Sequence, residues 1–354
     1  MIKKSNYLIL GLFLLVVLTK CTPSELEELN PYQYYFGKFD EVPIVTVPTR
    51  EVLSIPEFGA GGFKPGATQV PFFEDIFSGP SKGEITDTNI ILLNALYQKQ
   101  DSGTTINLSD EELENLLIPG AEIDTKLIVI LSNVMDDPKL KELLSELTLP
   151  TLDGVPFYNP DARVLKTKTS TLKEARVNST SPETLVTPCK QAAEESFLIR
   201  LELLNKEMET TLNSNQISQE NELKKLDSLS ASLQTLFDVS LSNTRDNLLL
   251  TVLELNRTAA QLYEQNIINE NEFIGLKTFI TVWVVKASLD LNELKKQQDA
   301  AIIYFKQESI DQLENIQIQF LNQLNQNYQV SLTSLNKIYE EVLENCHNQG
   351  GGSD

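Results

Sequence analysis

The long proline-free stretch from Cys189 to Cys346 constrains the fold of this chain more than any other feature. All 15 prolines lie at or before Pro188, and Gly275 is the one glycine inside the stretch. Proline costs about 3 kcal/mol in a helix interior and glycine about 1 kcal/mol, so a segment that avoids both is typical of long helices. We therefore expect residues 188–347 to be helical.

The best turn chemistry of this stretch lies at its midpoint, in residues 265–270, nearly equidistant from the two cysteines. Asn269 followed three residues later by Glu272 is typical of a helix start. A long helix folded in half here brings Cys189 beside Cys346, and we expect a disulfide bond between them. Each arm of about 78 residues would reach roughly 117 Å at the rise of an α-helix.

Apolar residues recur at alternating steps of three and four in both arms, which predicts one buried stripe along each helix. In the return arm this stripe continues to Cys346. The alternative is a four- or five-helix bundle, because polar stretches at 213–215 and 242–244 could break the outgoing arm. The return arm has no matching breaks. This favours a mainly α fold built on a long antiparallel helical hairpin or coiled coil.

Residues 31–150 predict a compact N-terminal region of mixed structure, rich in proline and aromatic residues. Its first part, 31–85, alternates β-prone runs with prolines that forbid a central strand. We expect extended segments here that wrap over a helical surface. Short helices are predicted at 86–100, 109–117, 124–135 and 138–147, with a capping box at Ser109 and Pro138 in a first turn.

The remaining parts of the mature chain are predicted to be a linker and a tail. Residues 151–187 are rich in Thr, Ser and Lys and predict a linker, and 348–354 predict a disordered tail. Within the N-terminal region, residues 127–131 are apolar on every side, so that helix is expected to be covered all round.

The first 21 residues have the layout of an export signal peptide: two lysines precede an apolar run, 7–18, that is shorter than the about 20 residues of a spanning helix. Residues 18–21 resemble the lipobox of bacterial lipoproteins, with Lys20 where that motif has a small residue. The resemblance implies lipid on Cys21. The polar, acidic residues 22–30 are similar to the tether of surface lipoproteins in Bacteroidetes-type bacteria.

These features predict an exported protein of the cell envelope, anchored to the outer membrane through acyl chains on Cys21, on its periplasmic or surface face. Simple secretion and an uncleaved anchor are the alternatives. In an oxidising compartment disulfides persist, and Cys189 and Cys346 form the remaining even pair. Two free buried cysteines are the alternative to that bridge. The net charge of −21 argues against nucleic acid as a partner, because phosphates are attracted by Lys and Arg.

Around the predicted turn, apolar residues occupy more faces than a two-helix seam can bury. The N-terminal region, a second copy of the chain, a partner protein or a membrane could cover them. The membrane alternative resembles the hydrophobic head of all-helical pore-forming toxins of the cytolysin A type, although Lys277 and Lys286 interrupt the run. The residues taken as a candidate partner or self-association interface are Phe273, Ile274, Phe279, Ile280, Trp283 and Val284.

Residues with catalytic potential are few. His347 is the only histidine, so multi-histidine metal sites are impossible and a histidine-bearing triad would have to use this residue. We expect no catalytic residue, metal or cofactor. The predicted function is a structural, scaffold or docking component that binds another envelope protein. The alternatives are a pore-forming protein and a glycan-binding lipoprotein whose Tyr34 and Tyr35 stack on sugar rings.

Overall fold

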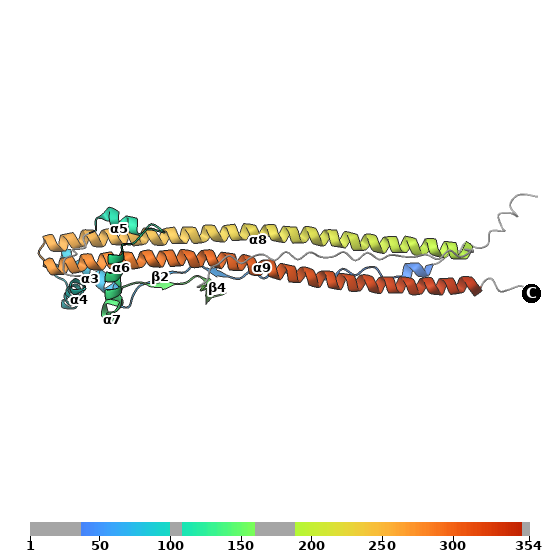
Figure 1. Cartoon of the computed structure of the whole chain (residues 1–354), viewed down its shortest axis with the longest axis horizontal. Helices are drawn as coiled ribbons and strands as arrows, with labels where there is room; N and C mark the ends of the chain where they lie inside the picture. The colour runs from blue at the N-terminus through green and yellow to red at the C-terminus, as the bar shows by residue number, and fades with distance from the viewer. Residues whose placement is uncertain (1–36, 100–107, 160–187, 349–354) are drawn as a thin grey trace, which may run out of the picture. The chain divides into compact units, whose positions relative to one another are not determined.

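The computed structural model describes residues 37–99, 108–159 and 188–348, and two long helices dominate it (Figure 1). Helix α8 (Pro188–Glu264) has 77 residues and helix α9 (Glu270–Asn348) has 79. They pack against each other as an antiparallel hairpin, which confirms the predicted fold class. The four- or five-helix bundle does not form, because α8 runs through both polar stretches without a break.

The polar stretches of α8 stay helical because their side chains find partners within the hairpin. The Thr244 hydroxyl donates to the Ser240 carbonyl one turn earlier, at 2.8 Å. The Asn215 amide donates to Oε1 of Gln317 on α9, also at 2.8 Å. Side chains of the types that often cap helices therefore form their hydrogen bonds here while the helix continues.

The turn between the helices has the predicted capping chemistry. The Asn269 backbone N–H donates to Oε2 of Glu272 at 2.8 Å, and the Glu272 N–H donates to Oδ1 of Asn269 at 3.1 Å. Asn266 takes a positive φ of 54°, which asparagine tolerates better than most residues. This reciprocal pair fixes where α9 begins.

The two helices keep one register. Asn205 contacts Tyr328, Gln234 contacts Asp299, and Asn256 contacts Lys277, so each step forward on α8 is matched by an equal step back on α9. The two cysteines, whose Cα atoms lie 5.8 Å apart, pair within two residues of this register.

The chain divides into two compact units, each of which contains a part of both helices. The described part of unit 1 consists of residues 37–50, 188–217 and 317–348. That of unit 2 consists of residues 51–99, 108–159 and 218–316. Unit 1 holds an apolar cluster formed by α8, α9 and the segment that begins with the 3₁₀ turn η1 (Gly37–Glu41).

The described part of unit 2 carries five short helices: α3 (Gln69–Lys82), α4 (Asp87–Gln98), α5 (Asp110–Leu116), α6 (Thr125–Met135) and α7 (Pro138–Lys141). They share one large core with the tip of the hairpin. Gly275 is required there, since a Cβ at this position would lie 2.0 Å from the Leu93 carbonyl oxygen of α4. The single glycine of the proline-free stretch thus allows two backbones to touch.

The described residues of unit 2 also form five short strands: β1 (Phe58–Gly59), β2 (Gly62–Lys64), β3 (Glu146–Thr148), β4 (Thr151–Leu152) and β5 (Val155–Pro156). They form two small antiparallel sheets, β1-β4-β5 and β2-β3. Phe58 stands opposite Leu152, and its ring contacts Phe237 and Phe305 of the long helices. Because β4 and β5 belong to a sheet, residues 151–156 are not part of a linker as predicted, and the predicted linker from residue 160 on lies outside the described residues.

Several helix predictions for the N-terminal region are confirmed. Ser109 and Glu112 form both hydrogen bonds of a capping box at the start of α5. Asp124 caps α6 by accepting from the Lys126 N–H at 2.9 Å. Pro138 occupies the first turn of α7, as expected.

Other predictions for this region are wrong. Residues 69–82, expected to be extended, form α3, where Pro71 falls in the first turn and needs no hydrogen-bond donor. The helix predicted at 138–147 ends at Lys141, and 146–148 form β3. The all-round cover expected for 127–131 is also wrong, because Ile128 is 41% and Val129 is 50% exposed.

Candidate functional site

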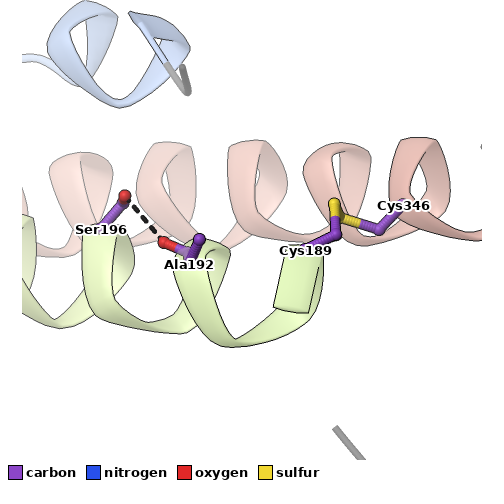
Figure 2. Close-up of a disulfide and its surroundings, with 4 residues drawn as sticks. All are labelled: Cys189, Ala192, Ser196 and Cys346. Atoms are coloured by element: carbon purple, nitrogen blue, oxygen red, sulfur yellow. Dashed lines mark hydrogen bonds between the residues drawn. A yellow bond between two sulfur atoms is a disulfide. The ribbon is translucent and has the colours of Figure 1, made fainter. Parts of the chain in front are cut away.

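The disulfide bond of unit 1 joins the first turn of α8 to the last turn of α9 (Figure 2). Cys189 and Cys346 are 157 residues apart in sequence, and their Cα atoms lie 5.8 Å apart. Cys189 is buried and Cys346 is half-buried. The predicted bridge is thus present, and it closes the hairpin at the end opposite its turn.

Residues 37–50, which we call the strap, bind along both helices of unit 1. Phe39, Val42 and Val45 are spaced three residues apart, and all three are buried in the apolar cluster of this unit. The partners that surround them include Leu204 of α8 and Leu324 of α9. After the 3₁₀ turn that contains Phe39, the strap matches the extended segment on a helical surface that the prolines predicted.

Helical side chains satisfy the backbone of the strap. Arg200 donates to the Val42 carbonyl, Glu207 accepts from the Val45 N–H at 3.1 Å, and Asn327 donates to the Thr46 carbonyl at 2.6 Å. These bonds replace the ladder of a sheet, which an extended segment otherwise needs for its buried polar groups. Lys38 also pairs with Glu341 at 3.2 Å on the surface.

Most of the residues that were predicted to form an interface around the turn are buried in unit 2. Phe279, Ile280, Trp283 and Val284 are at most 3% exposed, in the core shared with α3 to α7. Phe273 and Ile274 are half-buried. The N-terminal region itself therefore covers the apolar residues around the turn. The buried side chains of Phe279, Ile280, Trp283 and Val284 do not form a surface that a partner could bind.

Aromatic contacts and one polar chain hold this cover in place. The Phe73 ring lies edge-on to Trp283, with ring centres 5.4 Å apart, and Phe72 lies 4.9 Å from Phe279. The indole N–H of Trp283 donates to Ser145 Oγ at 3.2 Å, and that hydroxyl donates to Oε1 of Gln69 at 3.1 Å. Composition could not show which segment supplies these partners.

An open groove of about 380 Å³ lies beside this chain of hydrogen bonds. Its lining combines the apolar side chains of Phe63, Val70 and Phe73 with the polar side chains of Thr244 and Asn247 on α8. The lining also includes Trp283, which is only 3% exposed. The ring therefore contributes packing within the unit and little free surface to the groove.

The two lysines that interrupt the apolar tip have different partners. Lys286 pairs with Asp290 one turn later, and burial raises the pKa of Asp290 although Lys286 opposes this shift. Lys277 is 7% exposed and donates to two neutral oxygens, Oδ1 of Asn256 and the Leu108 carbonyl. Burial lowers the pKa of the Lys277 ammonium, and the nearby Asp110 carboxylate opposes this shift.

Two other properties of the described ranges bear on function. No group of three or more His, Cys, Asp or Glu side chains in them is placed to hold a metal ion. None of their helices is both long enough and apolar enough to cross a membrane. Lipidation at Cys21 and sugar stacking by Tyr34 and Tyr35 concern residues outside these ranges. Of the tail predicted at 348–354, Asn348 belongs to α9 and the other residues also lie outside these ranges.

Comparison of the chain with known protein families, with curated proteins and with solved structures finds no match.

Proposed function

We propose that this chain is a non-enzymatic cell-envelope lipoprotein whose hairpin serves as a spacer or docking arm for another envelope protein. The observation that supports this best is the disulfide-closed hairpin, in which two uninterrupted helices are joined at their free ends. Such a bridge persists in the oxidising compartments that the leader sequence indicates.

The position of the strap supports anchoring through unit 1. The described chain starts at Gly37, and Lys38 already pairs with Glu341, near the last turn of α9 and the disulfide. A lipid on Cys21 would therefore tether the disulfide end of unit 1. A tether of about 15 residues reaches at most about 50 Å when fully extended.

The anchor is tested with a Cys21→Ser variant expressed in a bacterium that processes lipoproteins. We expect the unaltered chain to enter the membrane fraction, to take up an alkyne-labelled fatty acid and to carry acyl groups on its N-terminal peptide. The variant should lose all three properties. The lipoprotein assignment would be contradicted if the unaltered chain and the variant were equally distributed between the membrane and soluble fractions and neither had an acylated peptide.

Docking is tested by site-specific photocrosslinking on the surface of unit 2. Ile128 and Val129 form an exposed apolar pair on α6, and Ile118, 44% exposed, is a further exposed apolar residue before it in the chain. A photoreactive residue at position 128 should trap one envelope protein. A probe at exposed Leu250 on α8 is the matched control. A product of twice the chain mass would instead show self-association, and no product at either position would count against docking here.

The alternatives make opposite predictions in two assays. Pore formation requires the apolar tip to leave the core that α3 to α7 share with it, and it predicts dye release from liposomes by the purified protein. Inert liposomes would favour the scaffold. Glycan binding that disappears when Tyr34 and Tyr35 are changed to alanine would favour the sugar-binding alternative.

A further inference from the structure

Three side chains of unit 2 form a connected polar group at the edge of its apolar core. Lys277 of α9 donates to Oδ1 of Asn256 on α8, and Nδ2 of Asn256 donates to Oδ1 of Asp110, the first residue of α5. Lys277 is 7% exposed, Asn256 is half-buried and Asp110 is exposed. An amine, a carboxamide and a carboxylate therefore stand in contact in that order.

The surroundings of Lys277 are unusual for a lysine. Its neighbours Leu276, Thr278 and Ile280 are at most 1% exposed, so α9 is closely packed around this residue. A buried ammonium is normally paired directly with a carboxylate, as Lys286 is with Asp290. Lys277 instead contacts an amide oxygen and a backbone carbonyl oxygen. Burial favours the uncharged amine, which is the nucleophilic form.

We propose that Lys277 and Asn256 become joined by an intramolecular isopeptide bond between the lysine Nζ and the Cγ of the asparagine side chain. The contact with Oδ1 places Nζ beside the carboxamide carbon that it must attack. The proposal concerns covalent chemistry within unit 2 and does not depend on the function proposed above.

The reaction balances without an oxidant or another reactant. The Lys277 ammonium first transfers a proton to the Asp110 carboxylate, which leaves a neutral amine and a carboxylic acid. Nζ then forms a bond to Cγ of Asn256, and the bond from Cγ to Nδ2 breaks. Asp110 returns its proton to Nδ2, which leaves with the remaining amine proton as ammonium. The products are a secondary amide, one ammonium ion and an ionised Asp110.

Asp110 is placed for this proton transfer because it already accepts a hydrogen bond from the leaving nitrogen, Nδ2. It also lies near enough to Lys277 to favour the ammonium electrostatically. The capping box of Ser109 and Glu112 fixes the start of α5, and Leu113 of the same helix is buried. The fold therefore holds the carboxylate against the Asn256 amide and near the Lys277 amine.

The bond would join α8 to α9 within unit 2 in a form that reducing agents cannot open. Unit 1 already holds a covalent link between the same two helices, the disulfide of Cys189 and Cys346. Each unit would then contain one cross-link, and only that of unit 1 would respond to thiols.

Mass spectrometry of the purified full chain tests the proposal. After reduction of the disulfide, we expect an intact mass lower than the sequence requires by the mass of one ammonia molecule. Trypsin should fail to cleave after Lys277, and one branched peptide should contain both Asn256 and Lys277. A chain of full mass that yields separate peptides for the two residues would overturn the proposal. Mass loss without the branched peptide would indicate a succinimide and would also overturn it.

Three variants identify the participants. Lys277→Arg keeps the positive charge but removes the amine, so the mass loss and the branched peptide should disappear. Lys286→Arg is the matched control in the same helix and should retain both. Asp110→Asn should leave the two side chains largely unlinked while circular dichroism shows unchanged helix content. A fully linked Asp110→Asn protein would contradict the role of Asp110, and a linked Lys277→Arg protein would contradict the assigned bond.

Discussion

Unit 1 and unit 2 are built on the same pair of helices but bury their apolar surfaces in different ways. In unit 1 the cover is the strap, a single extended segment with three buried apolar side chains and hydrogen bonds from both helices. In unit 2 the cover is a folded layer of five short helices and short strands that shares one large core with the hairpin.

The difference follows from the width of the apolar surface on the helices. In unit 1 each helix carries a narrow stripe, which its partner helix and the strap suffice to bury. Near the turn, α9 is buried on all sides from Leu276 to Val285, and a surface of that width needs a folded cover. Loss of stability should therefore be local in unit 1 and cooperative in unit 2.

Removal of the disulfide should have the largest effect, and it acts on unit 1. In the chain-entropy description, a bridge that closes a loop of 157 residues stabilises the fold by about 5 kcal/mol. The double variant Cys189→Ser, Cys346→Ser should lower the free energy of unfolding by up to this amount. Urea unfolding followed by circular dichroism measures it.

Hydrogen exchange shows whether that loss is local. Amides of the strap and of the first turns of α8 should lose protection in the double variant, while amides around Trp283 should retain most of theirs. A Cys21→Ser variant is the matched control. A change in unfolding free energy below about 1 kcal/mol would mean that the bridge is unnecessary in unit 1.

The second effect compares two buried phenylalanines, one in each unit. Phe279→Ala in unit 2 should cost about 4 kcal/mol, because the side chain is fully buried between α9 and α3. Phe39→Ala should cost less than about 2 kcal/mol, since the strap can detach locally before the helices separate. Denaturant unfolding of both variants gives the two values, and equal losses would contradict a locally detachable strap.

Much of the hairpin could be predicted because its determinants are local in sequence. The absence of proline indicated the helices, and Asn269 with Glu272 indicated the turn. The equal distances from that turn to Cys189 and Cys346 then predicted the disulfide, which the structure contains. Each of these inferences needs only helix geometry and neighbouring residues.

The cover of unit 2 could not be predicted in the same way. Helix α3 contains Pro71 and Pro80, and its sequence resembles the extended segments around it, so only its packing on Phe279 and Trp283 reveals a helix. The contact of Lys277 with Asn256 and, through it, Asp110 joins three elements that are distant in sequence. Lys277 alone indicated no more than an interruption of the apolar run.

A smaller effect is expected when the strap loses one backbone hydrogen bond. Glu207→Ala removes the acceptor of the Val45 N–H, and the net cost should be about 1 to 2 kcal/mol because a charged acceptor is lost. Glu209→Ala, on the exposed side of α8, should change the stability by less than about 0.5 kcal/mol. Exchange of the Val45 amide measures the effect directly, and unchanged protection would show that this bond does not hold the strap.

The smallest effect is the pH dependence contributed by Asp75 in unit 2. Partial burial alone would raise the pKa of this carboxyl, but hydrogen bonds from the Thr86 N–H, the Asn89 amide and the Thr86 hydroxyl outweigh burial and lower its pKa below 3.8. The distances are 2.9, 2.8 and 2.9 Å. Asp75 of α3 thereby binds the N-terminus of α4, whose N-cap residue Thr86 makes no side-chain capping bond to its own helix.

The sign of this dependence follows from the lowered pKa. The ionised carboxylate stabilises the folded state at pH values above the unfolded pKa, and the contribution disappears as the pH falls through the folded pKa. Asp75→Asn should therefore cost up to about 1 kcal/mol at neutral pH after solvent screening and almost nothing near pH 2. Urea unfolding of both proteins over this range measures the difference, with Glu74→Gln as the exposed control. If the loss of unfolding free energy in the variant did not depend on pH, the charge of the Asp75 carboxylate would not contribute to stability.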